Sequence, residues 1–272
     1  NGMAGHTAPA VFKRINAEVT EMFFELDGTF PNHEANPIDE QNLADLKQMV
    51  KKVRADIGLA FDGDADRCFL VDEKGNAVNP SLLTALIAER ELTKYPNSSI
   101  IYNLISSRAV REVIEEHGGV AIRSRVGHSF IKALMAESGA VFGGEHSGHF
   151  YFADFWRADS GMLAALHAIA ALGASNLKLS ELLAPYSRYF SSGEINSKVK
   201  DGAKIIQSLK VSYQAEPGVS IDELDGLTVN GDTWWFNVRA SNTEPLLRLN
   251  VEATSETQMA KLRDHLLALI RG

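Results

Sequence analysis

The sequence of 272 residues predicts an α/β protein with consecutive α/β/α domains, whose sheets are mixed and largely parallel, plus a smaller C-terminal α+β domain. Three observations lead to this fold class. Short apolar runs alternate with amphipathic helical stretches up to about residue 172, a pattern typical of βαβ units. Gly118 and Gly139 stand where two of those helices should end. Beyond residue 192 the pattern changes to a hairpin and one helix.

The first part of the chain should contain two helices and three strands. A glycine-rich turn opens the sequence, and such a turn normally follows a strand, so we expect further sequence upstream. Thr7 is the expected N-cap of the first helix and Asp39 that of the second. The apolar faces are Val11, Phe12, Ile15 and Val19 in the first helix and Leu43, Leu46, Val50 and Val53 in the second, with strands expected at 21–26, 57–61 and 68–71.

A second unit begins near Gly75 and alternates helices with strands. Asn79 followed by Pro80 is typical of a helix start. A linker with a short helix is expected at 174–192. The expected order is helix 80–89, strand 100–104, helix 108–117, strand 120–123, helix 129–137, strand 141–142 and helix 160–172.

The last part reads as a small α+β domain. Residues 233–238 and 247–253 predict a hairpin, since Leu247, Leu249 and Val251 alternate with polar residues in the second strand. Ser255 and Gln258 have the spacing of a capping box before a helix that runs to the end of the chain.

Composition excludes several classes of function. The net charge of -8 argues against a nucleic-acid or anionic-membrane surface. The single cysteine, Cys68, permits no internal disulfide and reads as a buried apolar residue rather than a reactive thiol. No signal-peptide pattern opens the sequence, and the most apolar helix is too short to span a bilayer. We therefore expect a cytoplasmic protein.

Residues 62–67 read DGDADR and form an acidic loop between two apolar runs. Glycine lets the backbone turn tightly, so that Asp62, Asp64 and Asp66 can approach one point. Carboxylates at such short distances repel one another unless a cation lies among them, and oxygen ligands suit Mg²⁺. Arg67 beside them can hold a phosphate that also contacts the metal. An EF-hand calcium loop is disfavoured, because Arg67 stands where that loop needs glycine; a solvated acidic turn is the plain alternative.

Two further polar turns follow. Residues 144–149 read GEHSGH, in which Glu145 and Ser147 can bind sugar hydroxyls and His149 can exchange a proton near neutral pH. The alternative interpretation of this turn is a polar loop whose histidine is hydrogen-bonded within the protein. Residues 239–245 read RASNTEP and sit at the tip of the predicted hairpin. Such a turn can bind an anion through hydroxyls, successive N–H groups and an arginine, or can be an ordinary hairpin tip.

These segments, in this order, resemble the α-D-phosphohexomutases, the family of phosphomannomutases and phosphoglucomutases. Residues 62–67 resemble its magnesium loop, 144–149 its sugar-specificity loop and 239–245 its phosphate-binding loop. Residues 127–132, GHSFIK, resemble a further substrate-contact segment. The likeness covers essentially the whole chain and is greatest to the bacterial phosphomannomutase-type branch.

The resemblance implies that residues 1–74 are an incomplete second domain, 75–188 a third domain and 189–272 a fourth domain. The first domain of the family carries a phosphorylated serine in a Thr-Ala-Ser-His-Asn-Pro-like loop, and no such segment occurs here. The missing N-terminal domain of the same protein is therefore an expected partner. Where many relatives place a substrate-contacting lysine, this chain has Ile105, and Arg108, Arg125 or Lys132 is a candidate replacement.

The implied activity is interconversion of hexose 6-phosphate and hexose 1-phosphate, with mannose favoured over glucose, through a phosphoserine and a bisphosphorylated sugar. We expect the fragment to be inactive alone, and the alternatives are a sugar-phosphate and Mg²⁺-binding module or a metal-dependent sugar phosphatase. The resemblance implies Asp62, Asp64 and Asp66 as metal ligands; Arg67, His149 and His128 as catalytic residues; and Glu145, Ser147, Arg239, Ser241, Asn242, Thr243, Arg248 and Lys132 as substrate-binding residues.

Overall fold

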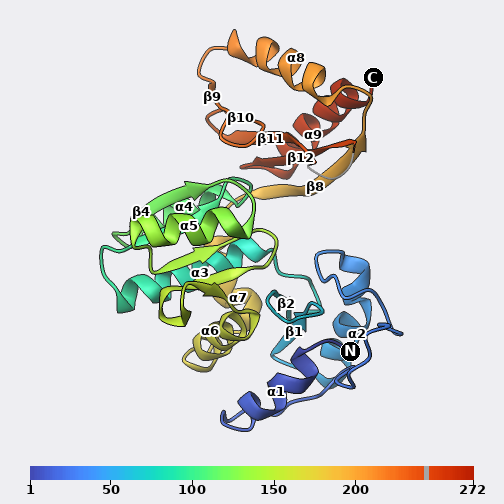
Figure 1. Ribbon diagram of the computed structural model, residues 1–272, viewed down its shortest axis with the longest axis vertical. Helices are drawn as coiled ribbons and strands as arrows, with labels where there is room; N and C mark the ends of the chain where they lie inside the picture. Colours follow the sequence, from blue (N-terminus) through green and yellow to red (C-terminus); the bar gives the residue numbers. More distant parts are fainter. Residues whose placement is uncertain (242–244) are drawn as a thin grey trace.

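The computed structural model describes residues 1–241 and 245–272, which form three sheets that follow one another along the chain (Figure 1). A two-stranded sheet lies toward one end of the elongated molecule and an antiparallel five-stranded sheet at the other, with a mixed five-stranded sheet between them. The mixed sheet and the separate antiparallel sheet agree with the predicted fold class.

The start of the chain differs from its prediction. Helix α1 (Ala4–Phe12) has Met3 at its N-cap, so Thr7 lies inside the helix, and it ends before Ile15 and Val19. The Met3 N–H donates to the Gly63 carbonyl at 2.9 Å, a tertiary contact that moves the helix start upstream. Residues 21–26 form no strand, because Phe23 has a φ of 54° and interrupts any extended backbone.

The rest of the first unit follows its prediction. Asp39 caps the 3₁₀ turn η1 (Glu40–Leu43), which leads into α2 (Ala44–Val53), and its carboxylate accepts the Gln41 N–H at 2.9 Å. Strands β1 (Ile57–Phe61) and β2 (Cys68–Asp72) pair antiparallel, so that residues 62–67 connect them. β2 is buried along its whole length, whereas β1 is fully buried only at Gly58.

The middle unit is a sheet of order β4-β3-β5-β6-β7, in which β3 pairs parallel with β4 and β5 and the other two pairings are antiparallel. The sequence predicted its parallel part and missed β6 and β7. Its strands are β3 (Ser99–Asn103), β4 (Val120–Ser124), β5 (Phe142–Gly144), β6 (Phe150–Phe152) and β7 (Ala158–Asp159). Its helices are α3 (Pro80–Lys94), α4 (Arg108–Glu116), α5 (His128–Ser138), α6 (Gly161–Gly173) and α7 (Leu179–Leu183), with 3₁₀ turns η2 (Ala153–Phe155) and η3 (Ala184–Tyr186).

The last unit is a fully antiparallel sheet of order β8-β12-β11-β10-β9. The predicted hairpin is confirmed as β11 (Trp234–Ala240) and β12 (Leu246–Ala253), followed by α9 (Glu256–Arg271). Ser255 caps α9, but the Gln258 side chain donates to Thr233 instead of completing a capping box. The sequence did not predict β8 (Phe190–Lys198), α8 (Gly202–Gln214), β9 (Ser220–Asp222) or β10 (Leu227–Asn230).

The apolar cores divide the molecule into two bodies, whereas its strands form three sheets. One apolar core joins β2 of the first unit to α3, α6 and β5 of the middle unit, and it includes Cys68, which is buried as expected. A second core lies wholly within the last unit, among residues such as Leu209, Phe236 and Leu266. The first two units therefore form one packed body, and the last unit is a body of its own. No helix in the described part of the chain is long and apolar enough to cross a bilayer.

Candidate functional site

The acidic loop lies at the turn of the β1–β2 hairpin, where the register pairs Phe61 with Cys68. Asp62, Asp64 and Asp66 each offer a carboxylate oxygen, and these oxygens lie within 4.8 Å of one another. Ala65 between the last two has a φ of 67°, so the backbone turns through the left-handed region at this point. The hairpin thus brings the three predicted metal ligands together.

Arg67 is tied to the same loop. Its Nε donates to Asp62 Oδ2 at 2.6 Å and its backbone N–H donates to Asp62 Oδ1 at 3.1 Å. Its Nη1 also donates to Asn36 Oδ1 at 3.3 Å. One carboxylate of the three is therefore neutralised by a guanidinium, while the other two have no such partner among the ion pairs of the described residues.

The charged form of Asp66 is disfavoured by its surroundings in the acidic loop. Burial and the neighbouring carboxylates of Asp62, Asp64 and Asp159 raise the pKa of Asp66 to about 7. Its Oδ1 atom is buried and has no hydrogen-bond partner among the described residues. A hard divalent cation would relieve both features, because it would supply a ligand for the free oxygen and offset the repulsion. The donor set therefore fits Mg²⁺.

The polar turn joins β5 to β6 and lies directly against the acidic loop. The Cys68 N–H donates to the Gly148 carbonyl at 3.1 Å, and Arg67 forms an isolated β-bridge with His149. Gly148 has a φ of 86°, and a Cβ there would lie 2.5 Å from the Phe69 ring. Glycine is therefore required for this close approach of the two segments.

Glu145 is buried in the turn rather than presented to solvent. It is 1% exposed, and Oε1 accepts the Gly127 N–H at 3.1 Å while Oε2 accepts the Tyr151 hydroxyl at 2.8 Å. The predicted sugar ligand thus has both oxygens engaged within the protein. Ser147 Oγ lies 2.9 Å from His149 Nδ1, at the more accessible side of the same turn.

His149 stands between the two loops. Its Nε2 is 3.6 Å from Asp66 Oδ1 and its Nδ1 is 3.7 Å from Glu145 Oε2. Burial lowers the pKa of His149 even though the carboxylates of Glu145, Asp159 and Asp62 act in the opposite direction, so its neutral form is favoured and can accept a proton. The exposed His128 lies nearby, with 6.3 Å between the two ring centroids.

Two residues that sequence reasoning missed complete this cluster. Asp159 offers a carboxylate oxygen within 4.8 Å of Asp66 and His149 ligand atoms, and it pairs with Lys132 Nζ at 2.7 Å. Tyr151 holds Glu145 and stacks near His149. Tyr151 lies in β6 and Asp159 in β7, two strands that were not predicted from the sequence. The apolar run of residues 150–152, directly after the polar turn, was the signal that could have indicated β6.

The third turn follows β11. Arg239 and Arg248 face each other in the β11–β12 register, and both guanidinium groups contact the carboxylate of Glu194, at 2.8 and 3.0 Å. Arg248 Nη2 also lies 3.5 Å from Ser241 Oγ. Glu194, on β8, was not predicted from the sequence. Asn242 and Thr243 lie outside the described residues.

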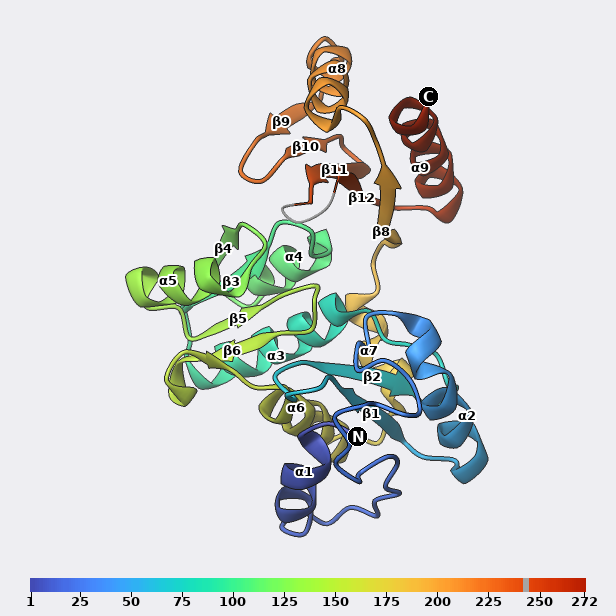
Figure 2. The same cartoon turned by 45° about the vertical axis from the view of Figure 1, so that its right-hand side comes forward.

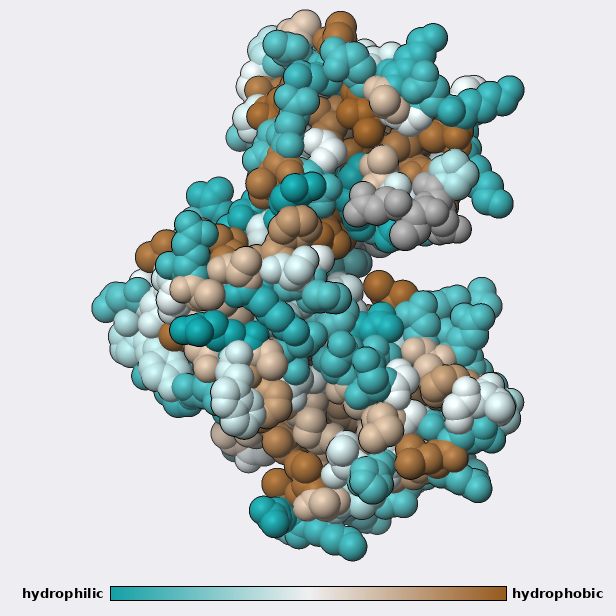
Figure 3. All heavy atoms as spheres, in the orientation of Figure 1, coloured by the Kyte–Doolittle hydropathy of each residue, from teal (hydrophilic) through white to brown (hydrophobic). Residues whose placement is uncertain are grey.

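The arginine pair is close enough to the polar turn to act on it electrostatically. Burial lowers the pKa of His146, and the charges of Glu194 and Arg239 also act on this ring. The surface shows a deep hollow between the lobe that carries α8 and α9 and the lobe that carries α2 (Figure 3). Arg239 thus acts on His146 of the polar turn, and the polar turn in its turn contacts the segment that follows the acidic loop.

Arg108, one of the candidates to replace the lysine that many relatives have where this chain has Ile105, has another role. Arg108 donates through its guanidinium to the carbonyls of Gly231, Asp232 and Trp234 in the last unit. It is therefore committed to the contact between units rather than to a ligand. Arg125 lies over the Phe130 ring at 4.8 Å, and Ile105 is buried.

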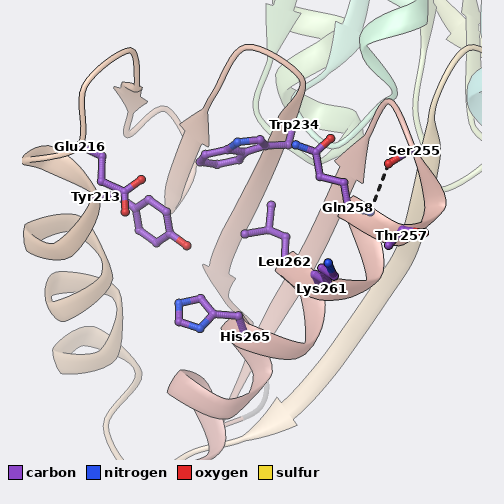
Figure 4. Close-up of a pocket in the computed structure, with 9 residues that line it drawn as sticks. All are labelled: Tyr213, Glu216, Trp234, Ser255, Thr257, Gln258, Lys261, Leu262 and His265. Carbon is purple, nitrogen blue, oxygen red and sulfur yellow. Dashed lines mark hydrogen bonds between the residues drawn. The ribbon is translucent and has the colours of Figure 1, made fainter.

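A cavity in the last unit is a separate feature. It measures about 580 Å³ and lies between α8 and α9, with Trp234 and Tyr213 on its walls and His265 at its edge (Figure 4). Its lining contains no residue of the three loops, so it is not part of the candidate site.

Three family models match the chain in sequence order. Residues 1–75 match phosphoglucomutase/phosphomannomutase alpha/beta/alpha domain II, 79–189 match alpha/beta/alpha domain III and 194–269 match the C-terminal domain. A phosphomannomutase of Methanocaldococcus jannaschii is 44% identical over 90% of this chain and 54% of its own length. A phosphoglucomutase of Neisseria gonorrhoeae is 37% identical over 100% of this chain and 60% of its own length.

Solved structures agree with these matches. A phosphoglucomutase/phosphomannomutase family protein of Burkholderia thailandensis has a TM-score of 0.89 and 33% identity, over 98% of this chain and 58% of that one. The N-acetylphosphoglucosamine mutase of Aspergillus fumigatus, in complex with GlcNAc-6P and magnesium, has a TM-score of 0.57 at 15% identity and shows a shared fold alone. The chain thus spans a little over half the length of the relatives that it matches.

Proposed function

Because this chain belongs to the phosphoglucomutase/phosphomannomutase family, we propose that it forms the metal- and sugar-phosphate-binding part of a phosphohexomutase. The reaction interconverts hexose 6-phosphate and hexose 1-phosphate, with mannose as the preferred sugar and glucose as the second. A phosphoserine outside this chain donates its phosphoryl group to the hexose phosphate, and the bisphosphorylated sugar then returns its other phosphoryl group to the serine. The proposed domains are residues 1–74, 75–188 and 189–272.

The acidic loop is the proposed metal site. Asp62, Asp64 and Asp66 hold Mg²⁺, which when bound offsets the negative charge of a transferring phosphoryl group. Arg67 places a guanidinium beside the carboxylates, where it can contact the same phosphate. The free oxygen and raised pKa of Asp66 support this assignment.

The polar turn is the proposed sugar site. Ser147 and Glu145 bind ring hydroxyls, and the Gly127 N–H and the Tyr151 hydroxyl orient the Glu145 carboxylate, whose oxygens can each accept one more hydrogen bond. Neutral His149 accepts the proton of the attacking hydroxyl through the ring nitrogen that faces the acidic loop. His128 and Lys132 stand at the edge of the same cluster and contribute to substrate binding.

The arginine pair is the proposed site for the phosphate that does not react. Arg239 and Arg248 already hold the carboxylate of Glu194, whose planar anionic group resembles one edge of a phosphate. An incoming phosphate takes over part of these contacts, with Ser241, Asn242 and Thr243 as additional donors.

The observation that carries this proposal is the direct contact of the acidic loop with the polar turn, through Cys68 N–H to the Gly148 carbonyl and His149 to Asp66. This contact supports the proposal, because the carboxylates of the acidic loop, the His149 ring and Ser147 lie close together. Phosphoryl transfer to a sugar needs all three within reach of one another.

The decisive experiment is a mutase assay with mannose 1-phosphate and Mg²⁺. It is run on the 272-residue chain and on the protein made from the complete reading frame that encodes it. We expect mannose 6-phosphate from the complete protein only, with Mg²⁺ required. Release of free phosphate instead would indicate a phosphatase, and tight hexose-phosphate binding without turnover by either protein would indicate a binding module.

A further inference from the structure

The last unit contacts β4 and the segment that follows it at two separate points, Arg123 and Val126. Figure 2 shows the connection between β9 and β10 facing β4. Asp222 Oδ2 accepts from Arg123 Nη1 at 2.8 Å, and Asp225 Oδ2 accepts the Val126 backbone N–H at 3.2 Å. Both aspartates belong to the β9–β10 connection and its flanking strand residue. One short segment of the last unit therefore reaches across to the middle unit.

The second of these contacts leads to the polar turn. Gly127, the next residue after Val126, donates its N–H to Glu145 Oε1 at 3.1 Å. Two successive backbone N–H groups thus bind two carboxylates, one from each unit. Only the φ and ψ angles of Val126 separate the two N–H groups, so a displacement of one is passed to the other.

Gly127 has little freedom to absorb such a displacement. It is the N-cap of α5 with a φ of 129° and ψ of 133°, a conformation open mainly to glycine. Residues after it are held in the helix. A shift of Asp225 therefore reaches the Gly127 N–H and, through it, the buried carboxylate of Glu145.

The Asp225 carboxylate accepts the Val126 N–H, whereas the Asp225 backbone is held by other hydrogen bonds. The Asp225 carbonyl accepts from Asn237 Nδ2 at 3.0 Å, and the same amide donates to Thr228 Oγ1. The turn thus keeps its shape when the Asp225 carboxylate is removed. Asp222→Asn offers a matched control, because Asp222 Oδ2 binds Arg123 and does not lead to Glu145, while an amide oxygen can still accept the Leu224 N–H that Asp222 Oδ1 accepts at 2.7 Å within the same connection.

We propose that Asp225 is a positioning residue for the polar turn: through Val126 and Gly127 it makes the hydrogen bonding of Glu145 depend on how the last unit sits on the middle unit. This inference rests on the proposed function, since Glu145 is there a sugar ligand. It adds that docking of the last unit sets the carboxylate that meets the sugar hydroxyls. The phosphate-binding arginines and the sugar turn are then coupled by one backbone segment.

The first test is hydrogen exchange on the protein made from the complete reading frame. Asp225→Ala should speed amide exchange at Gly127 and at residues 144–149 by roughly two- to thirty-fold, the range of a transmitted coupling. Asp225→Asn, which keeps an acceptor oxygen, should restore most of the protection. Asp222→Asn, which keeps an acceptor for the Leu224 N–H, should leave residues 144–149 unchanged. The proposal is overturned if Asp225→Ala leaves that segment as protected as in the wild type, or if Asp222→Asn deprotects it equally.

The second test separates positioning from simple loss of stability. Asp225→Ala should raise KM for mannose 1-phosphate by roughly two- to thirty-fold with a smaller change in kcat, and should leave affinity for inorganic phosphate unaltered. In a Glu145→Gln background the same substitution should have no further effect on KM. Additive effects would contradict the coupling. A wild-type protein without mutase activity would refute the proposed function, while the exchange result would still decide the coupling.

Discussion

Replacing Glu145 by glutamine tests whether the buried carboxylate of the polar turn is a sugar ligand. Glutamine keeps the shape but has one acceptor oxygen for the two donors, the Gly127 N–H and the Tyr151 hydroxyl. A buried donor without an acceptor costs about 1–3 kcal/mol. The Tyr151 hydroxyl can turn and accept from the new amide, so we expect a stability loss near 1 kcal/mol. Alanine would instead leave both donors without a partner, which makes it the less informative change.

The effect on binding should be selective. Hydrogen bonds to a charged acceptor are about twice as strong as neutral ones, so losing the charge should weaken hexose-phosphate binding by roughly five- to thirty-fold. Inorganic phosphate, held by the arginine pair, should bind as before. Calorimetric titration with mannose 6-phosphate and with inorganic phosphate measures both affinities.

A matched control is Glu73→Gln, because Glu73 also accepts two hydrogen bonds, from the backbone and hydroxyl of Ser180, away from the site. It should lower the melting temperature without changing either affinity. Unaltered affinity of Glu145→Gln for mannose 6-phosphate, or an equal loss for both ligands, would refute the role given to Glu145.

Two further outcomes follow from the same geometry. Asp64→Asn should lower turnover of the complete protein at saturating Mg²⁺ far more than it weakens hexose-phosphate binding, because it removes a metal ligand and no sugar contact; unchanged turnover would remove the metal assignment. Burial, with Arg90 and Lys94 nearby, lowers the pKa of His167 to about 4. Its neutral form thus stabilises the fold above pH about 6.5, and this contribution is lost as the pH falls toward 4. His167→Phe, which can keep the stacking on Phe152, should make the melting temperature less acid-sensitive in that range, and an identical pH profile would contradict the assignment.

The elements that could be predicted from sequence are those with strong local signals. Asn79, Ser160 and Ser255 all cap the helices that follow them, because a side-chain oxygen next to an orphan backbone N–H is a local interaction. The βαβ alternation likewise gave the parallel part of the middle sheet correctly. These features need no knowledge of distant residues.

The missed elements depend on contacts far along the chain. β8 reads as polar from residue 191 to 194, yet it pairs with β12 about fifty residues later. β6 and β7 are only three and two residues long and exist through pairing with β5 and with each other. Residues 21–26 show the opposite error, since an apolar run read as a strand while Phe23 adopts a left-handed backbone. In β6, β7 and β8, tertiary pairing overrides local propensity.

The candidate site likewise combines features that local sequence indicated with features that depend on residues far along the chain. The sequence identified the residues at the three turns but not what holds them, namely Tyr151 and Gly127 on Glu145, and Glu194 on the two arginines. The burial of Glu145 could not be predicted, because a glycine-flanked turn normally lies at the surface. Arg108, read as a candidate ligand, instead binds three carbonyls of the last unit.

How the units are joined explains why the chemistry is divided among them. The acidic loop and the polar turn belong to units that share one apolar core, so their mutual geometry is fixed by packing. The arginine pair belongs to a unit with a separate core, which meets the rest through hydrogen bonds of Arg108, Arg123 and Asp225 in the described residues. Such polar contacts exchange with water at little net cost, whereas separating an apolar core does not. The acidic loop and the polar turn are thus rigid relative to each other, and the arginine pair can move relative to them, as the proposed binding of either end of a hexose phosphate requires.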